Sequence, residues 1–277
     1  MMSYPHLPPE ILDHTVDFLH DDSEALKGCC LVSKSWIPRA RKHLFADVRF
    51  PIGRTLESWK KTFPDPSTSP ARYTKMLFIG CLHIVKAADA EAGGWITSFR
   101  HLERLGVSSR STVLCLPDSE DISLVPLHGL SPTVKYLCAN FIFLPSAHIF
   151  DLILSFPQLE DLDLTASGTS LEERNEFGDG PSTIVQPSSS PTLTGSLVLS
   201  LNRGMRPITR RLLSLPGGIN FRELDLTWFE EEDVLLTMGL VEECSHALES
   251  LDISCELIGT PVRIVESAFA PITHFSP

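Results

Sequence analysis

The chain has 277 residues, of which 43% are hydrophobic and 21% charged, and its formal net charge is -12. This length and apolar share predict a folded protein with one large domain or two smaller ones. The acidic excess argues against general binding to nucleic acid or anionic membranes, which requires clustered lysine and arginine. One short basic group is interpreted as a solvated helix face in preference to a docking patch for an acidic partner; it comprises Lys34, Arg39, Arg41 and Lys42.

The 7 cysteines are scattered and odd in number, which predicts free thiols in a reducing compartment. There is no CxxC pair, and Cys81 with His83 lacks further ligands at metal-site spacing, so neither a metal nor a cofactor is predicted. The chain begins without the basic and apolar regions of a signal peptide, and no apolar run reaches the ~20 residues of a membrane span. We therefore predict an intracellular, soluble protein, cytoplasmic and/or nuclear.

Three short helices are predicted within residues 5–48. Pro8 and Pro9 suit the first positions of a helix, and Glu10 suits the positive end of its dipole. Ser23 is expected to cap a second helix, and Pro38 to open a third. Apolar spacing of three and four residues gives the first helix one apolar face, formed by Ile11, Leu12, Thr15, Val16 and Leu19. Three helices of this size form a bundle that is marginal without further packing.

The same residues resemble an F-box motif. LPPEIL, from Leu7 to Leu12, is followed in the family's order by LVSKSW, from Leu31 to Trp36. Two features depart from the common pattern: the spacer HDDSEALKGC is longer, and Phe45 stands where many members have a second tryptophan. The ending HLF and the longer spacer resemble F-box proteins of mushroom-forming fungi.

The resemblance implies that the bundle binds the Skp adaptor and, through it, the cullin of a ubiquitin ligase. The remainder of the chain would then select a protein target for ubiquitination. Each leucine or isoleucine buried against a partner is worth ~1.5–3 kcal/mol, so a few can anchor an interface. The alternative is that all these residues form the core of one larger domain. By similarity, the contacts to the Skp adaptor come from Leu7, Pro8, Ile11, Leu12, Leu31, Val32 and Trp36.

Residues 49–72, which include PDPSTSP, predict a linker, and residues 73–277 carry an internal repeat. The repeat has the form L-x-x-L-x-L and recurs at intervals of roughly 25–35 residues, as in solenoid proteins. A further weak copy in YTKMLFIG has no fixed register. The six copies are Leu102, Leu105, Val107; Val134, Leu137, Ala139; Leu159, Leu162, Leu164; Leu193, Leu197, Leu199, with one inserted residue; Phe221, Leu224, Leu226; and Leu248, Leu251, Ile253.

The alternation in each copy predicts a strand with one buried face, and the intervening segments predict covering helices at 147–155, 208–215 and 230–244. The predicted fold class is therefore α/β, with a three-helix F-box followed by an irregular leucine-rich repeat solenoid of parallel strands and covering helices. A compact α/β domain with an ordinary parallel sheet is the competing fold. Residues 167–192 predict a mobile loop, and the lack of a polar capping repeat leaves open an incomplete repeat domain.

Parallel stacking would align equivalent strand positions in columns on the exposed face. One column is acidic in three of six repeats and the next is polar in all six, which favours a target segment that is basic or rich in hydrogen-bond donors. The alternative is that half-exposed strands are polar simply because they face water. The candidate substrate-binding residues are Asp163, Thr165, Asp225, Thr227, Asp252 and Ser254.

No catalytic pattern is present: the chain lacks GxSxG, GxxxxGK[ST], HExxH and a GxGxxG that follows a strand. We therefore predict a protein that is not an enzyme. One hypothesis is a substrate-recognition adaptor of a ubiquitin ligase. The other is a structural interaction protein that uses the F-box to join a Skp-containing assembly without ligase activity. The two differ in whether the cullin is present.

Overall fold

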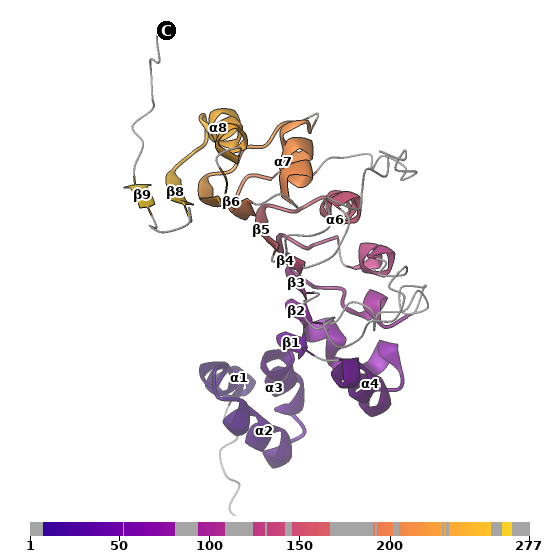
Figure 1. The fold of residues 1–277 in the computed structure, drawn as a ribbon. Coiled ribbons are helices and arrows are strands. Elements are labelled where there is room, and N and C mark those ends of the chain that lie inside the picture. The colour runs from indigo at the N-terminus through magenta and orange to yellow at the C-terminus, as the bar shows by residue number, and fades with distance from the viewer. Residues whose placement is uncertain are drawn as a thin grey trace, which may run out of the picture.

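The computed structural model describes residues 8–51, 53–80, 94–108, 124–130, 132–141, 146–166, 191, 193–201, 205–215, 217–228, 230, 233–255 and 262–267. It begins with three helices, α1 (Pro9–Phe18), α2 (Ser23–Val32) and α3 (Ile37–Leu44). These helices surround a small core of their own, formed by Val16, Leu26, Cys29 and Ala40. The three predicted helices are thus present, and Figure 1 shows them at the β1 end of the sheet.

Helix α2 begins one residue earlier than predicted. Its N-cap is Asp22 and not Ser23. The Asp22 carboxylate accepts the backbone N–H groups of Glu24 at 3.1 Å and Ala25 at 2.9 Å. One carboxylate thus satisfies two of the unpaired donors at the start of a helix, which explains why the aspartate takes the cap position.

Beyond the bundle, the described strands form one sheet in which they follow the order of the sequence. Strands β1 to β8 are parallel, and β9 pairs antiparallel with β8. Figure 1 shows them as one curved row. The bounds are β1 (Asp47–Phe50), β2 (Met76–Ile79), β3 (Arg104–Ser108), β4 (Tyr136–Phe141), β5 (Asp161–Ala166), β6 (Ser196–Leu201), β7 (Glu223–Trp228), β8 (Ser250–Cys255) and β9 (Val262–Ser267).

The predicted repeat frame coincides with the strand register. The middle residues of the six copies are successive partners across β3 to β8, namely Leu105, Leu137, Leu162, Leu197, Leu224 and Leu251. All six are buried in one continuous core. The same column extends to Leu77 of β2 and Val48 of β1, which fixes the register that the sequence left open in YTKMLFIG.

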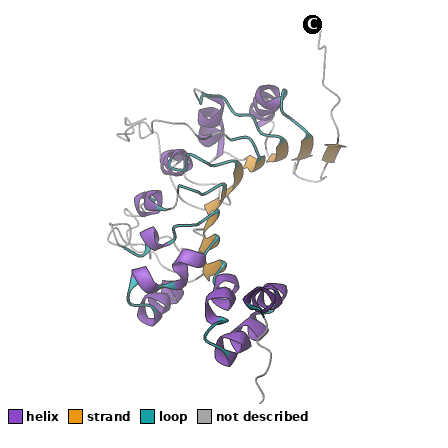
Figure 2. Ribbon diagram, turned by 180° about the vertical axis from the view of Figure 1, so that it is seen from behind, coloured by secondary structure: helices purple, strands orange, loops and turns teal. Residues whose placement is uncertain are grey.

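The helices between the strands cover one face of the sheet (Figure 2). They are α4 (Gly53–Thr62), α6 (Ser146–Leu154), α7 (Arg206–Leu213) and α8 (Asp233–Cys244), with short 3₁₀ helices at η1 (Pro66–Thr68), η2 (Pro70–Tyr73), η4 (Ile96–Ser98) and η6 (Val125–Gly129). The strand order never reverses, unlike that of a doubly wound sheet. The α/β architecture with parallel strands is confirmed, and it is compatible with a solenoid.

Residues 49–72 do not form the predicted linker. They contain the end of β1, helix α4 and two 3₁₀ helices, and Phe50, Leu56 and Ala71 belong to the main core. The prolines and serines that suggested a loop act at helix starts: Pro66 and Pro70 open the two 3₁₀ helices. The predicted loop at 167–192 lies outside the described residues, apart from Pro191.

Two polar arrangements hold the repeats in place. Arg206 at the start of α7 donates from Nε to Asp233 of α8 at 2.6 Å and from Nη2 to Glu230 at 2.7 Å. Asp233 is fully buried, and its hydrogen bond raises the pKa of the Arg206 guanidinium above its ordinary value. The second arrangement lies just before β6. The fourth repeat has its inserted residue before Gly195, and the Gly195 carbonyl still accepts a hydrogen bond from the backbone N–H of Arg222, as the equivalent carbonyls do in other repeats.

Candidate functional site

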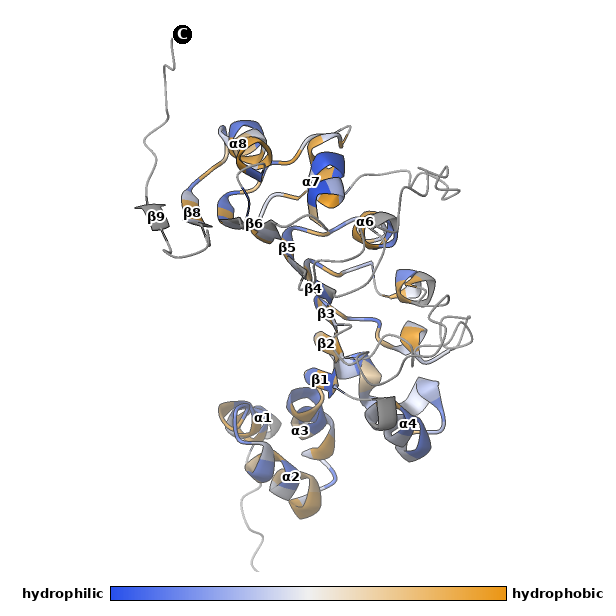
Figure 3. Cartoon of the chain, in the orientation of Figure 1, coloured by the Kyte–Doolittle hydropathy of each residue, from blue (hydrophilic) through white to orange (hydrophobic). Residues whose placement is uncertain are grey.

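Four large apolar side chains of the bundle lie in solvent. Leu31 is 89% exposed and Val32 71% exposed at the end of α2, and Phe18 of α1 is 79% exposed. Ile11 is the fourth, and Figure 3 shows apolar residues on all three helices. We call these four residues the bundle face. Single exposed apolar residues are common on proteins, whereas Leu31 and Val32 are adjacent and both uncovered at the end of one helix, which suggests a contact surface there.

Sequence reasoning placed three of these residues among the adaptor contacts and missed Phe18. Phe18 lies seven residues after Ile11, two helical turns along the same side of α1, so the seven-residue spacing was the available signal. The other residues predicted to contact the adaptor differ in their exposure. Pro8 is exposed at the start of α1, Leu12 is partly buried, and Leu7 lies outside the described residues. Trp36 packs against the bundle core.

A charged cluster ties α1 to α3. The Asp17 carboxylate accepts hydrogen bonds from Arg39 Nε, at 2.5 Å, and from Arg39 Nη2. It also lies 2.7 Å from His43 Nε2. The bonds from Arg39 and then His43 lower the pKa of Asp17 well below its usual range. Arg39 is therefore paired within the bundle, whereas Lys34, in the turn before α3, and Arg41 and Lys42, on α3, are exposed.

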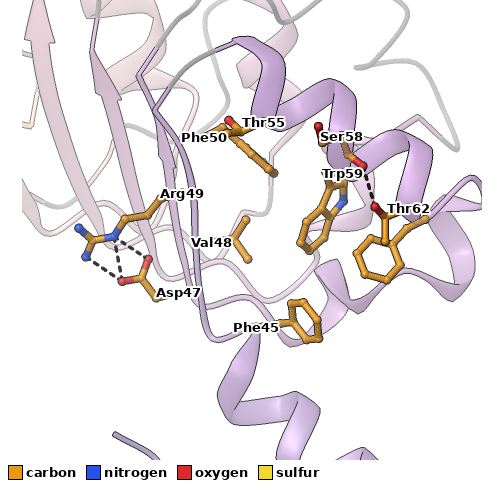
Figure 4. A pocket seen from close by; sticks show the side chains of 10 residues that line it. Phe45, Asp47, Val48, Arg49, Phe50, Thr55, Ser58, Trp59 and Thr62 are labelled. Atoms are coloured by element: carbon orange, nitrogen blue, oxygen red, sulfur yellow. Dashed lines mark hydrogen bonds and ion pairs between the residues drawn. The ribbon is translucent and has the colours of Figure 1, made fainter. Parts of the chain in front are cut away.

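A pocket of about 360 Å³ lies where the bundle joins the sheet, between β1 and α4. Figure 4 shows Phe45, Val48 and Trp59 around this space, with Asp47 and Arg49 bonded to each other on the other side of β1. The Trp59 ring meets Phe45 edge-on at 5.8 Å and lies 4.8 Å from the Phe63 ring. Its Nε1 atom is buried without a hydrogen-bond partner among the described residues. These ring contacts pack Phe45, the C-cap of α3, against the helix α4 that lies beside β1.

The predicted substrate residues lie on the face of the sheet opposite its covering helices, which we call the open face. Asp225 and Asp252 are register partners, whereas Val198 separates Asp163 from Asp225. In the next column the hydroxyls of Thr227 and Ser254 hydrogen-bond to each other at 2.8 Å. Thr165 of the same column is the register partner of Asn140, whose Oδ1 is buried without a partner among the described residues. The structure thus brings the six residues onto one surface.

Asp163 is hydrogen-bonded to two side chains of the neighbouring strand. Its Oδ2 accepts the hydroxyl of Tyr136 at 3.3 Å and the thiol of Cys138 at 3.4 Å, both on β4. Burial and then the Asp163 charge raise the pKa of Tyr136 to about 12 and that of Cys138 to about 12. At neutral pH both groups are therefore neutral donors that hold the Asp163 carboxylate in place.

The sequence did not point to the aromatic part of the open face. Phe78 of β2 lies against Gly106 of β3, where an added Cβ would come within 2.7 Å of the ring. The Arg104 guanidinium stacks 4.4 Å from the centre of the Tyr136 ring. The register of β2 was needed to see that these residues share one surface, because Phe78 belongs to the copy whose frame was ambiguous.

Within the described residues no group of His, Cys, Asp and Glu could hold a metal ion. In that same part of the chain, none of the helices has the length and apolar content for crossing a membrane. Compared with protein-family models, curated proteins and solved structures, the chain matches none, so both surfaces are interpreted from their own residues and geometry.

Proposed function

We propose that the protein is an F-box type substrate-recognition adaptor of a ubiquitin ligase, with no chemistry of its own. Helices α1 to α3 would bind the Skp adaptor, and the sheet, as an irregular leucine-rich repeat solenoid, would bind the protein target. The observation that carries this proposal is the bundle face: Leu31 and Val32 are exposed at the end of α2, within the LVSKSW segment that resembles the family motif.

The division between buried and exposed apolar residues supports the proposal. Val16, Leu26 and Cys29 already supply a core for the bundle, so Leu31 and Val32 are not required to hold its helices together. An exposed leucine and valine gain ~1.5–3 kcal/mol each when another protein covers them. The aromatic contacts of Phe45 with Trp59 and Phe63 would keep the adaptor-binding helices at a fixed place relative to the sheet.

Binding to a purified fungal Skp adaptor tests this proposal. The double variant Leu31→Asp, Val32→Asp removes ~3–6 kcal/mol of interface burial, which corresponds to a loss of binding of at least a hundredfold. The matched control is Leu235→Asp. The Leu235 side chain is 77% exposed, and it belongs to α8, at the other end of the molecule (Figure 1). The control variant should bind like the unchanged protein. Equal binding by the double variant, or no binding by the unchanged protein, would contradict the proposal.

Recruitment of the cullin separates a ligase adaptor from a structural Skp-binding protein. Reconstitution with the Skp adaptor and a cullin should give a complex of all three proteins that ubiquitinates a bound target. A stable complex with the Skp adaptor that excludes the cullin would instead favour the structural role.

A further inference from the structure

On strands β2 to β4 the open face carries a cluster of side chains suited to protein recognition. The edge of the Phe78 ring meets Gly106, and in the neighbouring open-face column Arg104 stacks on Tyr136. Tyrosine and arginine are enriched among the residues that dominate binding energy in protein interfaces. The Tyr136 hydroxyl is also fixed to Asp163, so the ring is already oriented before any partner arrives.

The strands beyond this cluster change the sign of the surface. From β5 to β8 the open face presents Asp163, Glu223, Asp225 and Asp252. Asp225 and Asp252 are direct register partners, an arrangement in which like charges oppose each other. A negative surface repels phosphate groups of nucleic acids and anionic lipids and favours a basic partner.

We propose that the open face binds an extended peptide segment of the target that crosses the strands, with one apolar residue over Phe78 and Gly106 and basic residues over Asp163 and Asp225. This inference rests on the proposed function, because it names the class of target that the adaptor would recruit. Charge complementarity identifies the occupant: the aromatic cluster accepts the apolar side chain and the carboxylates accept lysine or arginine.

The strand register sets the spacing of the recognised residues. Gly106 and Asp163 are two strands apart, through Cys138, and Asp163 and Asp225 are two strands apart, through Val198. Neighbouring strands lie about 4.8 Å apart, so each step of two strands spans ~10 Å. An extended chain covers ~3.3–3.6 Å per residue, so ~10 Å corresponds to about three residues. The segment should therefore have an apolar residue with basic residues about three and six positions away.

Selection from a library of random 12-residue displayed peptides tests the inference on the full chain alone. We expect the enriched peptides to share an aromatic or aliphatic residue with lysine or arginine about three and six positions from it. Enriched peptides without this spacing, enriched acidic peptides, or no enrichment at all would each overturn the inference.

Variants of the open face then assign each part of the peptide. Asp163→Asn with Asp225→Asn keeps the side-chain shapes, so selection should lose the basic residues and keep the apolar one. With Phe78→Ala, selection should lose the apolar residue and keep the basic residues, and a selected peptide should bind at least tenfold more weakly. Leu235→Asp should leave peptide binding unchanged. Unaltered selection by these open-face variants would overturn the inference even if the peptides carry the expected spacing.

The bundle variant Leu31→Asp, Val32→Asp separates this inference from the proposed function. It should lose the Skp adaptor and still select the same peptides, because its changes lie on α2 and not on the sheet. Peptide selection that succeeds when the Skp adaptor never binds would leave the peptide site standing and remove only the ligase role. The opposite result would remove the peptide site alone.

Discussion

Gly195 occupies a place where the structure leaves no room for a side chain, and Gly195→Ala should lower the stability of the protein measurably. An added Cβ would lie 2.8 Å from Cγ of Asp161 and 3.2 Å from the Glu160 carbonyl oxygen. Asp161 Oδ1 accepts the backbone N–H of Ser196 at 2.6 Å and its hydroxyl at 3.0 Å. The alanine would push this carboxylate away from both donors at the start of β6.

The magnitude follows from these two hydrogen bonds. A bond to a charged acceptor contributes ~1.5–3 kcal/mol, and the partly exposed Asp161 places each bond near the lower value, for a loss of about 3 kcal/mol. Alanine restricts the unfolded chain more than glycine does, which returns ~0.4–1 kcal/mol. The net destabilisation is therefore about 2 kcal/mol, and for a chain of this size it lowers Tm by ~4–8 °C.

Thermal unfolding of four proteins measures this effect: the unchanged chain, Gly195→Ala, Asp161→Ala and the double variant. Because Asp161→Ala removes the obstructing carboxylate, the double variant should unfold near the Tm of Asp161→Ala, with a coupling of about 2 kcal/mol. Gly217→Ala is the control, since nothing lies within 4 Å of its added Cβ, and it should be nearly neutral. Additive effects, or an equal Tm for Gly195→Ala and Gly217→Ala, would refute the reasoning.

Three further predictions concern ionisable groups. Arg206→Met leaves the fully buried Asp233 carboxyl group without its main partner, so it should lower the free energy of unfolding in urea by ~3–5 kcal/mol; a smaller loss than for an average surface variant would contradict the pairing. Burial and a neighbouring carboxylate raise the pKa of Cys138 to about 12, so iodoacetamide at pH 8.5 should modify Cys138 slowly in the folded chain and rapidly in guanidinium, as read by peptide mass spectrometry; rapid labelling of the folded chain would disagree. Hydrogen bonds from Arg39 lower the pKa of Asp17, so they stabilise the bundle above the unfolded-state pKa of ~3.9. This stabilisation is lost as the pH falls below that value. Acid unfolding followed by circular dichroism should therefore depend less on pH for Asp17→Asn than for the unchanged chain.

Much of the sheet could be predicted from the sequence, because the L-x-x-L-x-L frame records a local requirement. In every copy the middle and last apolar residues point to the same side of a strand, and burial of that side is enough to set the register of Leu105, Leu137 and Leu162. The first two strands were missed or left without register. The frame of β1 begins with Phe45 and falls within the predicted bundle and linker, and in β2 the first position is Thr74, a buried polar residue.

The residues of the candidate surfaces were predicted less completely. Helical spacing identifies Ile11, Leu12 and Val16 as apolar positions of one helix, but it does not say which of them the bundle itself buries. Packing of α1 on α3 decides this, since it buries Val16 and leaves Ile11 and Phe18 in solvent.

Helical spacing with its start residues, together with the L-x-x-L-x-L frame, therefore determined by themselves that this chain begins with three short helices and continues as parallel strands with one buried side. Only the tertiary structure decided which apolar side chains stay uncovered and which polar and aromatic residues share the open face. The physical reason is that burial of a strand face depends on residues close in sequence, whereas Phe78, Arg104, Tyr136 and Asp163 become neighbours only when four separate strands are aligned.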